Sequence, residues 1–236
     1  MEFNFDSEDN IKATKTPSVK VLNDDGQLWI SNECVEICKW KGASCPHDIK
    51  TDKEGVTIPV NIIHKPRMII LQRSLLLKVE TRTGRILRTW ITKKQERKHI
   101  YVCVRKYLIF IVDEDNNPLH EVPVQLTAKE CFQLEFNQQL CEFRSVITKA
   151  YNEKATFMKD SWYSMCVFVP SFKSMMRGEG SKQRKACITT GYEKPSKENW
   201  ESLCIRRRTD NFGPDDLTYA QYVYKLYSET RKCCEA

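Results

Sequence analysis

Residues 65–106 read KPRMIILQRSLLLKVETRTGRILRTWITKKQERKHIYVCVRK, and their alternating pattern decides the fold. Successive side chains of a β-strand point to opposite faces of its sheet. In the segments 74–82, 85–93 and 98–105, apolar residues such as Leu77, Val79 and Val102 alternate with charged or aromatic ones. Gly84 stands in a short connection, where a tight hairpin requires a positive φ. We therefore expect antiparallel strands with one face in the core and one face lined by basic and aromatic side chains.

This stretch also concentrates the positive charge of the protein. It contains thirteen Lys or Arg residues against Glu80 and Glu96, a net charge of +11, whereas the whole chain carries +7. Ordinary protein surfaces intersperse both signs of charge. A second basic block with a net charge of +6 follows at 173–208, and its glycine-containing segment 172–185 is expected to be a flexible basic finger. The charge pattern therefore favours a polyanionic partner.

A basic and aromatic sheet face is typical of proteins that bind single-stranded nucleic acid, because cations follow the phosphates while rings stack on bases. The sequence predicts non-catalytic, sequence-tolerant binding of single-stranded DNA or RNA, in replication, recombination or repair. Trp90 and Tyr101 are expected to stack on bases. The residues expected to contact phosphates are Arg82, Arg88, Lys93, Lys94, Arg97, Lys98, Arg105, Arg184 and Lys185.

Three other interpretations stay open. In the first, the basic face is an ordinary solvated surface. In the second, it is the binding face of a structural or interaction protein, such as a phage or plasmid assembly component with an acidic partner. In the third, His120 and Glu121 serve acid–base catalysis. The acidic cluster at 113–115 is the densest candidate for a divalent ion, but a turn explains it better. No catalytic motif and no cofactor site is expected.

The most regular helical pattern follows the basic stretch. Phe132, Phe136, Leu140, Phe143 and Ile147 form one apolar stripe. The sequence predicts a helix over 127–150, opened by a capping box and packed behind the basic sheet face because its surroundings are acidic. A second helix is expected at 214–231. The whole is an α+β protein: a flexible arm at 1–18, then one domain at 19–236 whose curved antiparallel sheet has five or six strands and can close into an oligonucleotide-binding (OB-like) barrel.

Eleven cysteines without an expected export signal indicate reduced thiols and a cytoplasmic protein. No apolar run reaches the length that crosses a bilayer, so no membrane association is expected. Cys34, Cys38, Cys45 and His47 have the side-chain types of a zinc site. Their spacing matches no common zinc signature, so buried or incidental cysteines are the alternative. The oligomeric state is left open.

Four runs carry a resemblance to a known family: 118–123 (PLHEVP), 132–151, 162–173 and 186–195. Together they resemble a family of uncharacterised proteins encoded on cyanobacterial chromosomes and plasmids, over about residue 67 to the end of the chain. The resemblance implies a bacterial cytoplasmic setting. It supplies no catalytic or binding residues, so the predicted function rests on the charge pattern.

Overall fold

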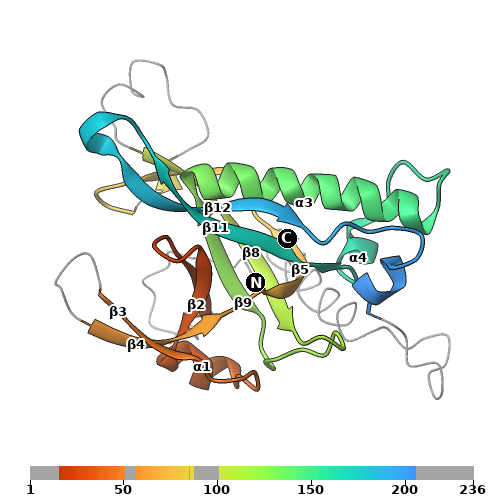
Figure 1. Cartoon of the computed structure of the whole chain (residues 1–236), viewed down its shortest axis with the longest axis horizontal. Coiled ribbons are helices and arrows are strands. Elements are labelled where there is room, and N and C mark those ends of the chain that lie inside the picture. Colours follow the sequence, from red (N-terminus) through yellow and green to blue (C-terminus); the bar gives the residue numbers. More distant parts are fainter. Residues whose placement is uncertain (1–15, 51–56, 85, 88–100, 206–236) are drawn as a thin grey trace, which may run out of the picture.

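The chain folds around one large mixed sheet, and the computed structural model describes residues 16–50, 57–84, 86–87 and 101–205 (Figure 1). The sheet has ten strands: eight follow the order β10-β5-β8-β9-β1-β2-β4-β3, β6 pairs with β8, and β7 pairs with β6. Its strands are β1 (Ser18–Leu22), β2 (Gln27–Ser31), β3 (Pro46–Lys50), β4 (Thr57–Ile63), β5 (Arg67–Arg73), β6 (Leu77–Glu80), β7 (Ile86–Leu87), β8 (Tyr101–Val112), β9 (Val124–Lys129) and β10 (Val167–Phe168). The other elements are the hairpin strands β11 (Pro170–Arg177) and β12 (Arg184–Tyr192), the helices α1 (Asn32–Cys38), α3 (Glu130–Tyr151) and α4 (Asp160–Tyr163), and the 3-10 turns η1 (Gly180–Lys182) and η2 (Trp200–Leu203).

The expected α+β class is confirmed, but the sheet is larger and less uniform than predicted. Ser18 and Val19 of β1 pair in parallel with Gln125 and Leu126 of β9, whereas the other pairs between described strands are antiparallel. A purely antiparallel sheet of five or six strands is therefore wrong. The strand order ends at β10 on one side and at β3 on the other, and no described strand joins these edges. The sheet is open and is not an OB-like barrel.

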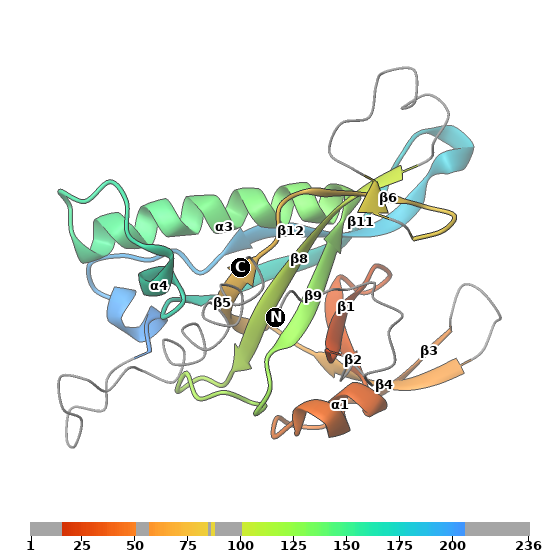
Figure 2. The ribbon, with the colours of Figure 1, turned by 180° about the vertical axis from the view of Figure 1, so that it is seen from behind.

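Helix α3 covers one face of the sheet (Figure 2). The predicted apolar stripe is confirmed, because Phe132, Phe136, Leu140, Phe143 and Ile147 are all buried. These side chains share the main core with inward residues of β8 and β9, among them Tyr107, Ile109, Leu126 and Ala128. The opposite face of the sheet has its own smaller cluster of Ile69, Leu71, Phe110, Val112 and Val167. Both faces of β5 and β8 are therefore buried at this end, which explains their continuous apolar sequences.

The predicted start of the helix at residue 127 is wrong. Residues 127–129 continue β9 and pair with residues 104–106 of β8, and α3 begins at Glu130. Lys129, which precedes the helix, makes no side-chain cap. Pairing with β8 holds residues 127–129 in an extended conformation, so they do not form the first turn of the helix.

The segment expected to be a flexible finger forms the regular hairpin β11–β12, which runs along α3. The turn between β1 and β2 docks on this hairpin. The Ser174 hydroxyl donates to the Asn23 carbonyl at 2.7 Å, and the Cys187 amide donates to Asn23 Oδ1 at 3.1 Å. Gly26 in the same turn has a φ of +63°, and a Cβ there would lie 2.4 Å from backbone atoms of Lys173 and Ser174. Only glycine fits this contact.

Two predicted features lie largely or wholly outside the described residues. The arm at 1–18 is described only from residue 16, and the helix at 214–231 is not described.

Candidate nucleic-acid interface

β9 ends at Lys129, which pairs with Val104 of β8. Residues 101–103 of β8 therefore extend past β9 at one end of the sheet. We call this end the distal sheet; it consists of β6, β7 and residues 101–104 of β8. Its register pairs Lys78 with Cys103 and Glu80 with Tyr101. These four side chains therefore share one face, and Leu77, Val79, Val102 and Val104 share the other. The predicted alternation of polar and apolar faces is confirmed for these strands.

Tyr101 and Lys78 are in contact on the polar face of the distal sheet. The Lys78 ammonium lies 4.8 Å from the centre of the Tyr101 ring, a cation–π distance. The Tyr101 side chain is partly exposed, and Arg82 is exposed in the turn that follows β6. A ring and a cation side by side provide the two kinds of contact that a nucleotide needs, one for the base and one for the phosphate.

Two arginines meet where α3 covers the neighbouring part of the same face. Arg105 Nη1 donates to Asn137 Oδ1 of α3, and Arg73 Nη1 from β5 donates to the same oxygen at 3.4 Å. Arg105 Nε is buried and has no hydrogen-bond acceptor among the residues that the structure describes. Neither guanidinium forms an ion pair with a carboxylate of the described residues. Burial raises the pKa of the neighbouring Tyr107 to about 12, so this phenol stays neutral beside them.

This arrangement corrects the expected position of the helix. The sequence places α3 behind the basic face, yet Arg105 and Tyr107 have the same orientation on β8, and both face α3. The helix covers the basic face beyond Val104 because Tyr107 and Ile109 of β8 point to this side and pack in the main core with the apolar stripe of α3. The distal sheet carries the part of the basic face that lies past the end of β9.

The tip of the β11–β12 hairpin carries further cations at the same end of the molecule as β6 (Figures 1 and 2). Arg184 pairs with Glu130, and Arg177 with Glu135 at 2.6 Å, both on α3. Lys185 lies 3.8 Å from Asp24 in the β1–β2 turn. The arginine side chains in these pairs are well exposed, and exposed ion pairs contribute only about 0–1 kcal/mol each. A phosphate can therefore compete for them.

The structure brings part of the predicted residue set together. Of the predicted contact residues it describes Arg82, Tyr101, Arg105, Arg184 and Lys185, all at this end. The other six, Arg88, Trp90, Lys93, Lys94, Arg97 and Lys98, lie outside the described residues. Sequence reasoning missed Arg73, Lys78 and Arg177 as contact candidates. Lys78 could have been found from its alternation with Leu77 and Val79, but nothing in the sequence places Arg73 beside Arg105.

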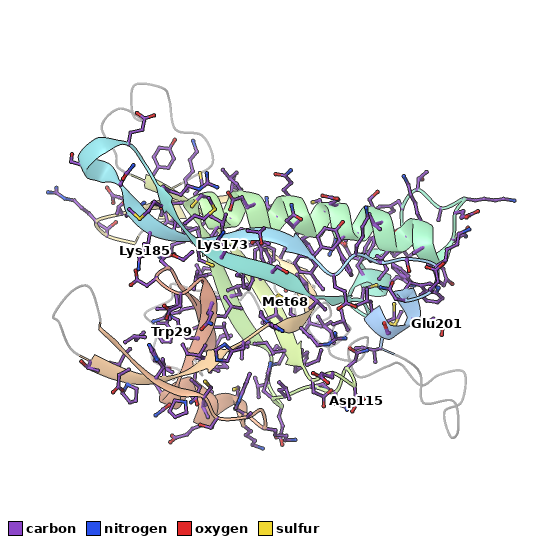
Figure 3. The ribbon with its side chains drawn as sticks, viewed as in Figure 1. Trp29, Met68, Asp115, Lys173, Lys185 and Glu201 are labelled. Atoms are coloured by element: carbon purple, nitrogen blue, oxygen red, sulfur yellow. The ribbon has the colours of Figure 1, made fainter. Side chains whose placement is uncertain are left out.

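The acidic cluster at 113–115 forms a turn, as the sequence favours. Asp113 Oδ1 accepts a hydrogen bond from the Asn117 amide at 2.8 Å. Figure 3 shows Asp115 and Glu201 at the opposite end of the molecule from Lys185. The acidic turn therefore lies far from the basic hairpin tip.

The four metal candidates are not brought together. Cys34 and Cys38 of α1 are buried in the main core, whereas Cys45 borders a separate cluster around Trp29, Val60 and Ile62. The Cys45 sulfur lies 3.2 Å from Nε2 of His64, not of His47. Within the described ranges, no three His, Cys, Asp or Glu side chains are grouped so as to hold a metal ion.

His120 is a structural residue and not an exposed acid–base group. It is 1% exposed and is stacked between Trp40 and Phe110. Nε2 accepts from the Ile111 amide at 2.8 Å, and Nδ1 lies 2.7 Å from the Val122 carbonyl. The ring is therefore neutral with its proton on Nδ1. It accepts a backbone hydrogen bond from the part of β8 that has no β9 residue beside it. Burial lowers the pKa of His120 to about 4, while the Val122 carbonyl opposes this shift.

The folded protein should lose stability as the pH falls from about 6.5 to about 4. The pKa of His120 is lower in the folded than in the unfolded state, so the unfolded state binds the extra proton in this window. The loss should approach about 3 kcal/mol at the acid end. Urea unfolding of the wild type and of His120→Gln at several pH values measures it, because other titrating groups cancel in the difference. Parallel pH profiles would contradict this role for His120.

Three comparisons with known proteins show what the chain is similar to. The family described as "Domain of unknown function (DUF5895)" matches residues 13–212. The chain belongs to this family. A relative, "Uncharacterized protein 254L" of Invertebrate iridescent virus 6, is 39% identical over an alignment of 273 positions that covers 98% of this chain and 79% of that protein. No solved structure matches the chain.

The resemblance to a family of unknown function is thus confirmed, while the expected cyanobacterial source finds no support in this viral relative. None of the helices in the described part of the chain has both the length and the hydropathy that crossing a lipid bilayer requires.

Proposed function

We propose that this DUF5895 protein binds single-stranded DNA or RNA without catalysis and with little sequence preference, through the distal sheet and the adjoining arginines. One observation carries the proposal. Arg73 and Arg105 both donate to Asn137 Oδ1, and neither forms an ion pair with a carboxylate of the described residues. Two like charges held together are stabilised by an anion, and guanidinium groups match phosphate geometry. The Lys78–Tyr101 contact beside them supports a base-stacking position.

The proposed path of the strand runs from the hairpin tip across the distal sheet. Arg184 and Lys185 contact phosphates at one side, and Arg82, Arg73 and Arg105 continue the positive track. Tyr101 stacks on a base together with Trp90. Arg88, Lys93, Lys94, Arg97 and Lys98 add phosphate contacts in the proposal because they belong to the same basic stretch. We place this activity in the cytoplasm, in replication, recombination or repair; the cyanobacterial distribution of the family is likewise still a prediction.

Replacing Arg73 and Arg105 by glutamine should weaken binding for every sequence and reduce its salt dependence. Each lost phosphate contact lowers the slope of log K against log salt by about 0.7 for single strands, so the double variant should lose about 1.4. Fluorescence anisotropy with labelled single-stranded and double-stranded oligonucleotides, at several salt concentrations, measures both quantities.

The matched control is Lys149→Gln with Lys154→Gln. Both lysines are exposed: Lys149 lies near the far end of α3, about 30 Å from its start, and Lys154 lies just beyond that end. This variant changes the net charge equally but should leave the salt slope unchanged. An equal loss in the two variants would mean that net charge alone drives binding, and would contradict the proposed path.

A protein partner is the second candidate, and one observation favours it. Large apolar side chains are exposed in β11 and before β6, with Leu75 78% and Met176 55% exposed. Exposed apolar groups beside cations suit an acidic protein surface in an assembly. Equal and weak binding of single-stranded DNA, duplex DNA and heparin would favour this candidate, because a single-strand site discriminates between them.

A further inference from the structure

Two cysteines far apart in the sequence face each other at the edge of the sheet. Cys166, just before β10, and Cys204, just after η2, form an isolated antiparallel bridge pair. Their sulfur atoms are 4.0 Å apart. Directly opposed residues in antiparallel pairs have Cα separations of about 4.5–5.5 Å, within the range that a disulfide spans. The backbones therefore need no large movement for the sulfurs to bond.

We propose that Cys166 and Cys204 form a reversible disulfide when the protein meets a two-electron oxidant such as hydrogen peroxide. The two positions differ in exposure, since Cys166 is 2% exposed while Cys204 is partly exposed. Cys204 is therefore the thiol that the oxidant reaches, and Cys166 is the thiol that resolves the intermediate.

The reaction balances in two steps. The Cys204 sulfur attacks one peroxide oxygen, the O–O bond breaks, and Cys204 becomes a sulfenic acid while one water leaves with the thiol proton. The Cys166 sulfur then attacks the sulfenic sulfur, the S–O bond breaks, and the second water carries away the Cys166 proton. Two electrons pass from the two thiols to peroxide. Burial holds the pKa of the Cys166 thiol well above its usual range, which keeps it protonated until this second step.

The bond would join two parts of the fold that already share polar contacts. The Ile205 amide donates to the Met165 carbonyl at 2.8 Å. Asn116 Nδ2, from the turn after β8, also holds one of the two parts, because it donates to the carbonyls of Ser202 and Cys204. The closed loop contains the whole β11–β12 hairpin. Oxidation would therefore link the two ends of the segment that carries the hairpin. This proposal does not depend on what the hairpin binds.

Peptide mapping of the full chain tests the proposal. The reduced protein is treated with hydrogen peroxide, its remaining thiols are blocked with N-ethylmaleimide, and it is digested with trypsin without reduction. The expected product joins peptides 160–173 and 198–206, each of which contains one cysteine. Its mass is about 2 Da below the sum of the two peptides, and dithiothreitol separates them.

Peptide 21–39 is the internal control, because Cys34 and Cys38 stand one turn apart on α1 and should both remain blocked as thiols. Cys204→Ser should abolish the linked product. Recovery of 160–173 and 198–206 as separate, fully blocked peptides would overturn the proposal. So would a link from either cysteine to a different one, such as Cys187 or Cys131. Both results come from the wild-type chain and do not depend on the folding of a variant.

Discussion

Replacing Trp90 and Tyr101 together by alanine is expected to weaken single-strand binding by about 2–6 kcal/mol, because each stacked base contributes about 1–3 kcal/mol. This free energy corresponds to a rise in Kd of about 30-fold to 10⁴-fold. The Lys78 ammonium lies against the Tyr101 ring on the polar face of the distal sheet. Anisotropy titration at one fixed salt concentration measures the loss, and circular dichroism checks that the fold is retained.

The control for this variant removes two rings elsewhere. Tyr151 and Phe157 are 46% and 71% exposed and lie at and beyond the far end of α3. Tyr151→Ala with Phe157→Ala removes a similar aromatic area, yet it should leave Kd unchanged. An unchanged Kd in the Trp90 and Tyr101 variant, with the fold intact, would exclude base stacking at these positions.

Phe136→Ala should lower the free energy of unfolding by about 3–5 kcal/mol, the usual effect of removing a buried phenylalanine ring. Phe136 is fully buried, and its ring lies 5.0 Å from Tyr107 and 5.5 Å from Phe168. It therefore joins α3 to both β8 and β10. The cavity left by alanine borders three elements, so no single side chain can fill it.

Urea unfolding of Phe136→Ala and of Leu134→Ala gives the comparison. Leu134 lies on the same helix and is 65% exposed, so its replacement should change stability by less than about 0.5 kcal/mol. Similar losses in both variants would show that helix propensity, and not the aromatic core, controls the stability of α3.

Local sequence patterns predicted an element correctly where the pattern fits only one kind of secondary structure. The apolar stripe of α3 matches a helical period over five buried residues, and the alternation in β6 and β8 matches the observed register. The start of α3 could not be read locally, because residues 127–129 satisfy a capping pattern and a strand pattern equally well. The ladder to β8, which depends on residues more than twenty positions away, decides between them.

The candidate site was predictable in composition but not in arrangement. The charge count located the basic stretch, and the alternation placed Tyr101 and Arg105 on one face. The count could not show that Tyr107 and Ile109 pack against α3, which therefore covers part of that face. It also could not show that Arg184 meets Glu130, since this pair depends on how the hairpin crosses the helix.

The parallel pairing of β1 with β9 constrains the order in which the molecule is built. The segment from β1 to β4 is synthesised before β9. One edge of β1 therefore has no pairing partner until β9, roughly a hundred positions later, has been synthesised. At common ribosomal speeds this delay lasts about 5–20 s, longer than most elementary folding events. During this time the nascent chain exposes an unpaired β-edge. Asp24 and Asp25 in the turn that follows β1 place negative charge close to this edge, a feature that opposes edge-to-edge pairing of strands.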